Sequence, residues 1–314
     1  MQRKTLIMLL LVGAVAAAYG QMARHDFLLW DDPGTVAGNP RLNPPTWSGV
    51  MHYWRHPEQG LYIPVTYSAW SILAAAAQLD QPDDRGIRLN PAIFHLANIA
   101  VHAATAVGVF LILRQLLSHD WAAASGALLY ALHPVQVEAV AWISGLKDVL
   151  SGMFAMLALW QYLLFARGDQ QHRRRWIHYS LATAALALAM LSKPSAMIVP
   201  LMALIIDALV IRRPIKRIAL SLGPWFVLAA ATALVAKLVQ PAIGVPHTPL
   251  WARPLIAGDA LSFYLYKLIF PLHLAIDYGR RPDVAMQSPA FYLAWIVPVL
   301  LGVLLLLFRR RARC

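Results

Sequence analysis

The sequence predicts an all-α protein that crosses a membrane about eight times. Hydrophobic residues make up 59% of the 314 residues and charged residues only 13%, which leaves too little polar surface to cover a soluble protein of this size. Several apolar runs also approach the roughly 20 residues that a helix needs to cross a hydrocarbon core of about 30 Å. We therefore expect a single membrane-embedded domain over residues 1–314.

Eight segments are apolar enough to be transmembrane helices. They cover residues 5–22, 91–113, 121–135, 149–166, 176–191, 194–210, 218–236 and 291–308. A further apolar segment, 260–276, carries Lys267, Pro271 and His273, so it either crosses the membrane or lies at its surface.

The distribution of charge decides between these two alternatives. If the N-terminus is cytoplasmic and only the eight segments cross, the inner side holds 15 of the 27 basic residues and three of the 15 acidic residues, and the whole net charge of +12 lies inside. The positive-inside rule favours this arrangement. A ninth crossing would place the basic cluster 309–313 outside. We therefore predict that both termini are cytoplasmic and that segment 260–276 is re-entrant or lies along the outer surface.

The first apolar segment has a second interpretation. A basic start, an apolar run and small residues near positions 18–20 also fit a cleaved signal peptide. We favour retention of this helix, because its removal would detach Asp31 and Asp32 from their membrane anchor.

The first outer loop, residues 23–90, is far longer than an ordinary connection, and long loops are often functional. It is rich in proline, tryptophan and tyrosine, which is typical of a chain that lies among lipid headgroups. Within it, residues 61–79 predict an interfacial helix, since Pro64 and polar flanks argue against a span. The long outer loops and short inner ones place the working face outside.

Asp31 and Asp32 lie just past the first span and are the leading candidates for a reactive centre. Two adjacent carboxylates at a membrane surface repel one another and gain nothing from lipid, so they are costly to keep unless they have a use. The plainer alternative is that they end the first span or open a turn at Pro33.

Further ionisable residues fall in the other outer connections. They are His133, Glu138, Lys147, Asp148, Lys193, Asp277, Arg280 and Arg281. Such clustering on one face suits a charged ligand at the membrane surface. Simpler interpretations exist, because His133 may end a helix and Lys193 may snorkel. His95 and His102, seven residues apart in the second span, are expected to pack or form hydrogen bonds rather than bind a metal.

Several strings of residues resemble those of one family and occur in its order. They are Trp30-Asp31-Asp32, His133-Pro134-Val135-Gln136-Val137-Glu138, Lys147-Asp148-Val149-Leu150-Ser151, Leu191-Ser192-Lys193-Pro194 and Tyr264-Leu265-Tyr266-Lys267-Leu268-Ile269-Phe270-Pro271-Leu272. The family comprises the bacterial relatives of the transmembrane and tetratricopeptide-repeat O-mannosyltransferases, within the C-type glycosyltransferases. The resemblance implies a multi-pass enzyme of the bacterial inner membrane. Such an enzyme transfers one sugar from a polyprenyl-phosphate donor to a periplasmic acceptor, either a protein hydroxyl or a glycan or lipid.

The resemblance also implies roles for individual residues. An acidic base is expected in the first outer loop, and the catalytic candidates are Asp32, Asp31 and Glu138, with Asp32 favoured by a small margin because it stands farther from the first span. A cation must offset the charge of the leaving phosphate, and the candidates are Lys147, Lys193, Arg280 and Arg281. His133, Asp148 and Tyr278 are expected to contact the sugar or the acceptor. Membrane lipids are the other expected partners, no nucleic acid is expected, and no cofactor is firmly implied, although a divalent cation stays open.

The chain departs from the family pattern in three places. The proline motif of the first loop, usually led by arginine or histidine, is here Tyr62-Ile63-Pro64-Val65. Ser144-Gly145-Leu146 replaces a charged stretch before Lys147, which removes one phosphate contact, and no tetratricopeptide repeats precede Cys314. Acceptor recognition is therefore expected to be intrinsic, supplied by a partner, or absent. A non-enzymatic membrane scaffold is the main alternative. A transporter is a weaker one, because transporters usually place ionisable groups near the membrane midplane.

Overall fold

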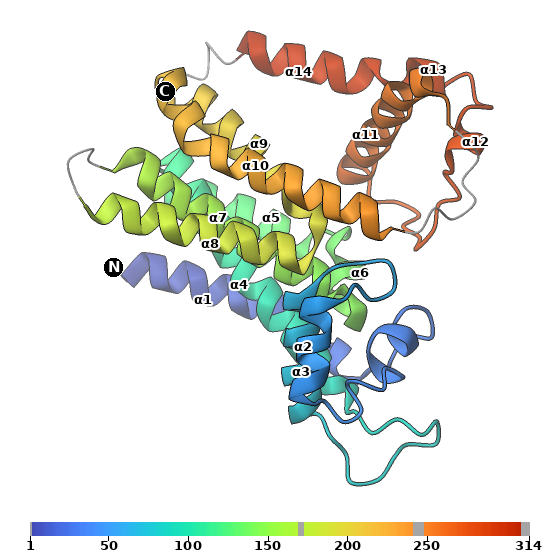
Figure 1. Cartoon of the computed structure of the whole chain (residues 1–314). Helices are drawn as coiled ribbons and strands as arrows, with labels where there is room; N and C mark the ends of the chain where they lie inside the picture. Colours follow the sequence, from blue (N-terminus) through green and yellow to red (C-terminus); the bar gives the residue numbers. More distant parts are fainter. Residues whose placement is uncertain (1, 169–172, 241–247, 309–314) are drawn as a thin grey trace. The chain divides into compact units, whose positions relative to one another are not determined.

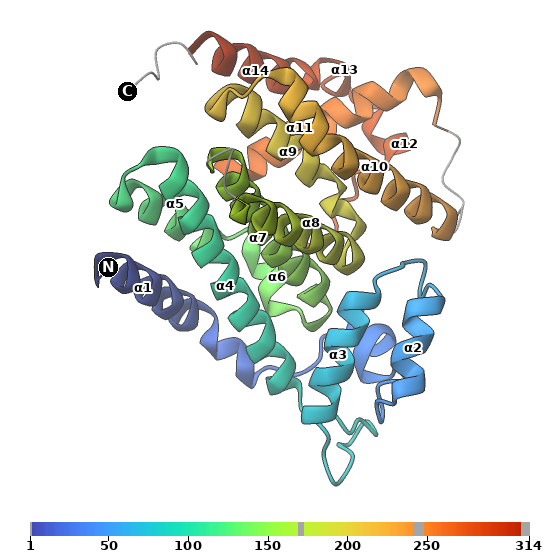
Figure 2. The same cartoon turned by 60° about the vertical axis from the view of Figure 1, so that its left-hand side comes forward.

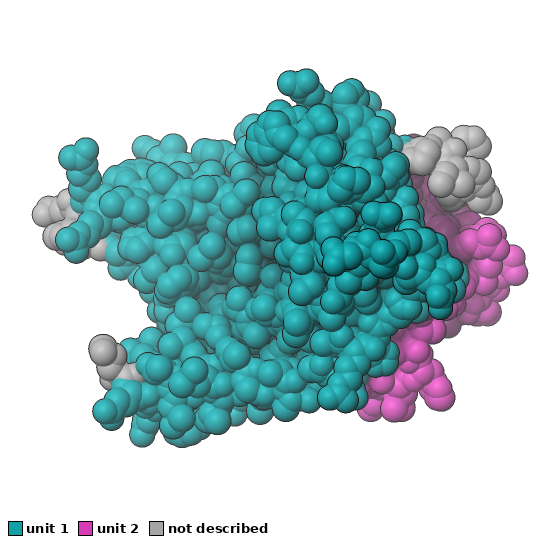
Figure 3. Space-filling view, turned by 90° about the horizontal axis from the view of Figure 1, so that it is seen from below, with its two compact units in different colours: residues 1–241 teal, residues 242–314 magenta. Residues whose placement is uncertain are grey.

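The computed structural model describes residues 2–168, 173–240 and 248–308. Within these ranges all regular secondary structure is helical, apart from isolated β-bridges, which confirms the all-α prediction. The chain divides into two compact units, residues 1–241 and 242–314 (Figure 3), and each is described by itself. That they act as one membrane domain stays a prediction.

Five helices of the first unit lie side by side (Figures 1 and 2). They are α1 (Gln2–Tyr19), α4 (Pro91–Leu117), α5 (Asp120–Leu132), α7 (Leu146–Arg167) and α8 (Arg174–Ser192). Helix α4 packs against α1, α5 and α7, and α7 packs against α8. Because the connections from α4 to α5 and from α7 to α8 are short, both pairs are antiparallel.

Local sequence fixes the ends of α4. The Asn90 side chain accepts a hydrogen bond from the Ala92 amide at 3.0 Å, and Pro91 occupies the first helical position, where its missing N–H costs nothing. At the other end Ser118 adopts a left-handed conformation with φ +54° and stops the helix. Arg114 then pairs with Asp120 at 2.8 Å across the turn into α5.

A buried charge network joins α7 to the helices that follow α8. These are η4 (Pro194–Ile198), α9 (Val199–Ile206), η5 (Asp207–Ile211) and α10 (Ile215–Val239). The Asp207 carboxylate accepts a hydrogen bond from the Tyr162 hydroxyl at 2.6 Å and from Arg213 Nε at 3.0 Å. Only 7% of the Arg213 side chain and none of the Asp207 side chain is exposed. Burial of this pair requires the complementary hydrogen bonds that it makes.

Five segments of the described residues are long and apolar enough to cross a membrane, namely Gln2–Arg24, Pro91–Leu117, Ile143–Arg167, Pro194–Ile211 and Ile215–Val239. Each coincides with one of the eight predicted spans. Of the other three, α5 has only 13 residues, α8 begins with two arginines, and Phe291–Leu307 is a shorter apolar stretch. The several apolar helices support a multi-pass membrane protein, while the count of eight stays a prediction.

The first loop folds into short helices. They are η2 (Pro33–Ala37), α2 (Trp47–Arg55) and α3 (Pro64–Ala76), so the helix expected within residues 61–79 is present. The Tyr53 and Tyr67 rings stack with centroids 4.2 Å apart and bind α2 to α3. The Thr66 hydroxyl donates to the carbonyl oxygen of Ser192 at 2.9 Å and ties α3 to the end of α8. The location of α3 at the membrane surface stays a prediction.

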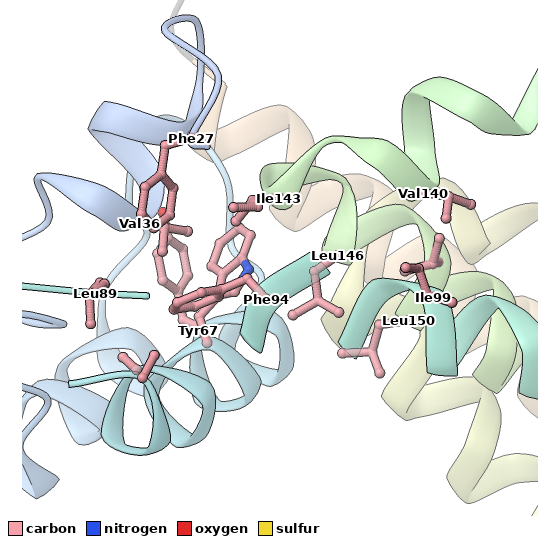
Figure 4. Close-up of a cluster of buried hydrophobic side chains, with 14 of the residues drawn as sticks. Phe27, Val36, Tyr67, Leu89, Phe94, Ile99, Val140, Ile143, Leu146 and Leu150 are labelled. Carbon is pink, nitrogen blue, oxygen red and sulfur yellow. The ribbon is translucent and has the colours of Figure 1, made fainter. Parts of the chain in front are cut away.

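The base of the first loop packs on a buried apolar cluster, which Figure 4 shows. Its members include Phe27, Val36, Tyr67, Phe94, Ile143 and Leu146. These side chains come from the first loop, from α4 and from residues 143–146, which lead into and begin α7. The cluster therefore holds together, by burial of apolar surface, three stretches that are far apart in the sequence.

The second unit is built around α11 (Arg253–Ile269), which packs against α13 (Phe291–Ala294) and α14 (Ile296–Phe308). It also contains η6 (Leu250–Ala252) and α12 (Pro282–Ala285). The predicted irregular segment 260–276 is helical up to Ile269 and irregular after it. Lys267 Nζ donates to the carbonyl oxygens of Leu272 and His273 at 2.5 and 3.1 Å, which holds this irregular part against α11.

Candidate active site

Asp32 is buried and links two segments of the chain. Its side chain accepts hydrogen bonds from the Leu28 and Ser144 amides, each at 2.9 Å, and only 1% of the residue is exposed. The first bond closes a tight turn, and the second attaches this turn to η3 (Ile143–Gly145). Burial raises the pKa of Asp32, the neighbouring Asp31 raises it further, and the two amide donors oppose both effects. Asp32 therefore organises the loop from inside.

Asp31 points the other way. Its side chain is 43% exposed, and its Oδ2 lies 3.5 Å from Lys147 Nζ. The sequence favours Asp32 over Asp31 as the substrate-facing carboxylate, whereas the turn places Asp32 inside and Asp31 outside. Of the two, Asp31 is the one that a substrate can approach.

A second ion pair lies beside the first. Lys147 and Asp148 occupy the first turn of α7, and Asp148 pairs with Lys193, which follows the last residue of α8. Both side chains of this pair are about one third exposed. The structure thus gathers Asp31, Lys147, Asp148 and Lys193 at one end of the helices, as two linked lysine–aspartate pairs.

Gly145 makes the turn before α7 possible. A Cβ at this position would lie 2.3 Å from the carbonyl oxygen of Ala139, which no side chain tolerates. The turn that Gly145 permits follows α6 (Gln136–Ala141) and delivers the Ser144 amide to Asp32. The Ser144-Gly145 departure from the family pattern therefore has a structural role here.

Polar side chains of α4 hold the same segment from the other side. Asn98 is fully buried, and its amide donates to the carbonyl oxygens of Trp142 at 2.7 Å and Val140 at 3.3 Å. His102 Nε2 lies 2.9 Å from the carbonyl oxygen of Ala131, the hydrogen-bonding role expected for it. Sequence reasoning overlooked Asn98, although an amide in an otherwise apolar helix is a signal that the backbone needs a partner there. Irregular backbone among apolar helices is stable only when such partners exist.

Glu138 and His133 lie near this end, on α6 and at the end of α5. Glu138 is exposed on α6, and none of the described residues pairs with its carboxylate. His133 ends α5, and its Nδ1 accepts a hydrogen bond from the Val135 amide at 3.3 Å. Among the described residues, no group of three or more histidine, cysteine, aspartate or glutamate side chains is placed to hold a metal ion.

Tyr278, Arg280 and Arg281 belong to the second unit. Arg280 Nη2 donates to Asp259 at 2.5 Å, and its guanidinium lies 4.8 Å from the centroid of the Phe263 ring. The Lys267 Nζ atom lies 4.9 Å from the centroid of the Tyr278 ring. Arg281 is exposed. Since each unit is described by itself, a meeting of these residues with the two lysine–aspartate pairs stays a prediction.

A family model supplies the relationship. The model described as dolichyl-phosphate-mannose-protein mannosyltransferase matches residues 69–240, more than half of the chain, and this range includes Glu138, Lys147, Asp148 and Lys193. The chain belongs to this family. The resemblance found from the sequence strings is thereby confirmed. No solved structure matches the chain.

Curated relatives share shorter stretches. The protein O-mannosyl-transferase Tmtc2 of Drosophila melanogaster is 26% identical over 191 residues, which cover 59% of this chain and 20% of the relative. Human TMTC2 is 32% identical over 127 residues, covering 40% of this chain and 15% of the relative. Protein O-mannosyl-transferase tmtc2 of Xenopus laevis is 42% identical over 77 residues, which cover 24% of this chain and 9% of the relative. The chain thus spans about a fifth or less of the length of these relatives.

Proposed function

We propose that this protein is a glycosyltransferase of the membrane that moves one sugar from a polyprenyl-phosphate donor to a hydroxyl-bearing acceptor. The observation that carries the proposal is the contact of Asp31 with Lys147, next to the Asp148 and Lys193 pair, in a chain of this family. A carboxylate beside ammonium groups supplies both the base and the cations that this reaction needs. Mannose is the first sugar to test, because the family description names it, and a protein hydroxyl is the first acceptor.

The proposed step balances as a displacement at the anomeric carbon. The acceptor oxygen forms a bond to this carbon while its proton passes to the Asp31 carboxylate. The bond from the carbon to the phosphate oxygen breaks, and the lipid phosphate leaves with the electron pair. Lys147 and Lys193 offset the charge that develops on this phosphate.

Asp31 is the better candidate for the base, for a geometric reason. A base must come within hydrogen-bond reach of the acceptor, and Asp31 is 43% exposed whereas both oxygens of Asp32 already accept amide hydrogens. We assign Asp32 the task of positioning the turn. Glu138 and His133 are proposed to contact sugar or acceptor from α6 and the end of α5.

The proposed location is the bacterial inner membrane, with eight spans, both termini in the cytoplasm and the ion pairs on the periplasmic face. The charge asymmetry supports it, because all of the net charge of +12 then lies inside. Under this topology the Asp207 and Arg213 network faces the cytoplasm. Cysteine labelling after residue 308 tests the topology, and a periplasmic C-terminus would refute it.

Transfer from a polyprenyl-phosphate-mannose donor to candidate acceptors, by the purified protein in lipid nanodiscs, tests the function. The Asp31→Asn variant should lose about 10²- to 10⁴-fold in kcat, the usual contribution of a general base. The matched control is Asp26→Asn, an exposed carboxylate of the same loop that pairs with Arg85. Full activity of Asp31→Asn would refute the mechanism. Absence of transfer by the parent with every donor, alone or with candidate partners, would favour the membrane scaffold.

A further inference from the structure

Three consecutive apolar side chains point outward directly before Asp31. Leu28, Leu29 and Trp30, here called the apolar ridge, are 46%, 74% and 64% exposed. Phe27, the residue before them, is only 4% exposed and packs against the Phe94 ring. The chain thus turns from buried to exposed and back to buried at Asp32 within six residues.

The turn is fixed at both ends, so the exposure of the ridge is a built feature. The Asp32 carboxylate accepts from the Leu28 amide at one end of the ridge and from Ser144 in η3, and the Trp30 amide donates to the Leu28 carbonyl oxygen at 2.8 Å. Because Asp32 is buried and bound by these donors, the turn that carries the ridge is held to α4 and η3 from its inner side, while the ridge side chains stay exposed.

The ridge is continuous with the charged pair. Asp31 follows Trp30 directly and lies 3.5 Å from the Lys147 ammonium group. A fixed apolar surface next to an ammonium group matches a ligand that joins an anionic phosphate to a long hydrocarbon chain. The ridge also lies only a few residues beyond the candidate span that ends at Arg24, where such a chain would leave the membrane.

We propose that the apolar ridge is the docking surface for the isoprenoid chain of the lipid-phosphate donor, with the donor phosphate at Lys147. The inference rests on the proposed function and names the residues that recognise the lipid part of the donor. In this arrangement the chain lies across Leu29 and Trp30, and the sugar is held on the far side of the phosphate, at Asp31.

Photocrosslinking tests the contact without any transfer reaction. The probe is a polyprenyl phosphate with a diazirine in its first isoprene units, added to the full-length protein in nanodiscs. The expected label falls in the tryptic peptide of residues 25–41, disappears with excess unlabelled polyprenyl phosphate, and is weaker in Lys147→Gln. A diazirine-bearing phosphatidylglycerol that labels this peptide equally, or that competes equally, would overturn the proposal in favour of ordinary bilayer contact.

Kinetics with the polyprenyl-phosphate-mannose donor give a second readout. The Leu29→Ser, Trp30→Ser double variant should raise KM for the donor about tenfold and leave kcat within about twofold, because only apolar contact is removed. The matched control is Trp47→Ser, Ile72→Ser, at positions 77% and 72% exposed on α2 and α3, which should change neither constant. An unchanged KM in the ridge variant would refute the inference. Specific crosslinking by a parent that transfers no sugar would instead refute the proposed function alone.

Discussion

Replacement of each aspartate of the pair by asparagine should separate the two roles that the structure gives them. Asp32 accepts two amide hydrogen bonds at 2.9 Å, whereas an asparagine has one acceptor oxygen and presents an NH₂ group to the other amide. One buried N–H then loses its partner, which costs about 1 to 3 kcal/mol. The remaining bond also loses its charge, which costs about 1 kcal/mol more. Relief of carboxylate desolvation offsets part of this sum.

The net cost of Asp32→Asn is therefore about 2 kcal/mol, which lowers the unfolding midpoint by about 4 to 8 °C in a unit of this size. Asp31→Asn removes only one exposed contact at 3.5 Å, worth about 0 to 1 kcal/mol. Its stability should match that of the parent while its transfer rate falls. The sequence alone suggests that both variants fold equally well, and the buried position of Asp32 changes that expectation.

Thermal unfolding in detergent, followed by tryptophan fluorescence at matched protein concentration, measures the stability of each variant. Mannose transfer measures its activity. Asp32→Leu, which removes both acceptors, should be less stable than Asp32→Asn. If Asp32→Asn unfolds at the same temperature as the parent, the hydrogen bonds that Asp32 accepts from the Leu28 and Ser144 amides do not stabilise the protein. If Asp31→Asn unfolds several degrees below the parent, its apparent catalytic defect has a structural origin.

Three further predictions test the supporting structure. Asn98→Leu should lower the free energy of unfolding by about 2 kcal/mol, because two carbonyl oxygens lose their donor. It should also lower kcat about tenfold, because the turn before α7 shifts. Unfolding and transfer like those of the parent would contradict this prediction. Arg213→Met should lower the free energy of unfolding by about 3 to 5 kcal/mol, because it leaves the buried Asp207 carboxylate without its cation. The Asp207→Leu, Arg213→Met double variant should recover most of this stability, and a double-mutant cycle measures the recovery. Burial raises the pKa of Tyr53 to about 12, so the folded state favours the neutral phenol. The contribution of this phenol to the free energy of unfolding is complete below about pH 10 and is lost as the pH rises toward 12. Unfolding midpoints between pH 8 and 11 should accordingly fall more steeply in the parent than in Tyr53→Phe, and parallel curves would refute this.

The helices were largely predictable because their signals are local. The apolar run predicted a span at 91–113, and α4 extends it to Leu117. The span predicted at 218–236 lies within α10. The segment after α5 was harder, because α6 and η3 owe their conformation to the Asn98 amide and to Asp32, contacts that periodicity does not reveal.

The sequence named the members of the candidate site but not their geometry. Asp31 was expected because adjacent carboxylates at a membrane surface are costly, and Lys147 and Lys193 because the family resemblance requires a cation beside the leaving phosphate. Their pairing was not, since 116 residues separate Asp31 from Lys147. The preference for Asp32 rested on its distance from the first span. The direction of a side chain in a tight turn depends instead on hydrogen bonds to distant backbone, such as the Ser144 amide.

The position of Lys147 gives a final argument for an anionic ligand. A lysine in the first turn of a helix faces the positive end of the helix dipole, so it is unfavourable there unless anions lie nearby. In the folded chain Asp31 meets its ammonium group, and Asp148 in the same turn pairs with Lys193. Two lysines and two aspartates sum to zero, and the Asp32 carboxylate is turned inward and buried against the Leu28 and Ser144 amides. In the proposed reaction the donor phosphate enters a nearly neutral cluster at a helix N-terminus, where the α7 dipole and the two ammonium groups attract it and the exposed Asp31 carboxylate takes the acceptor proton.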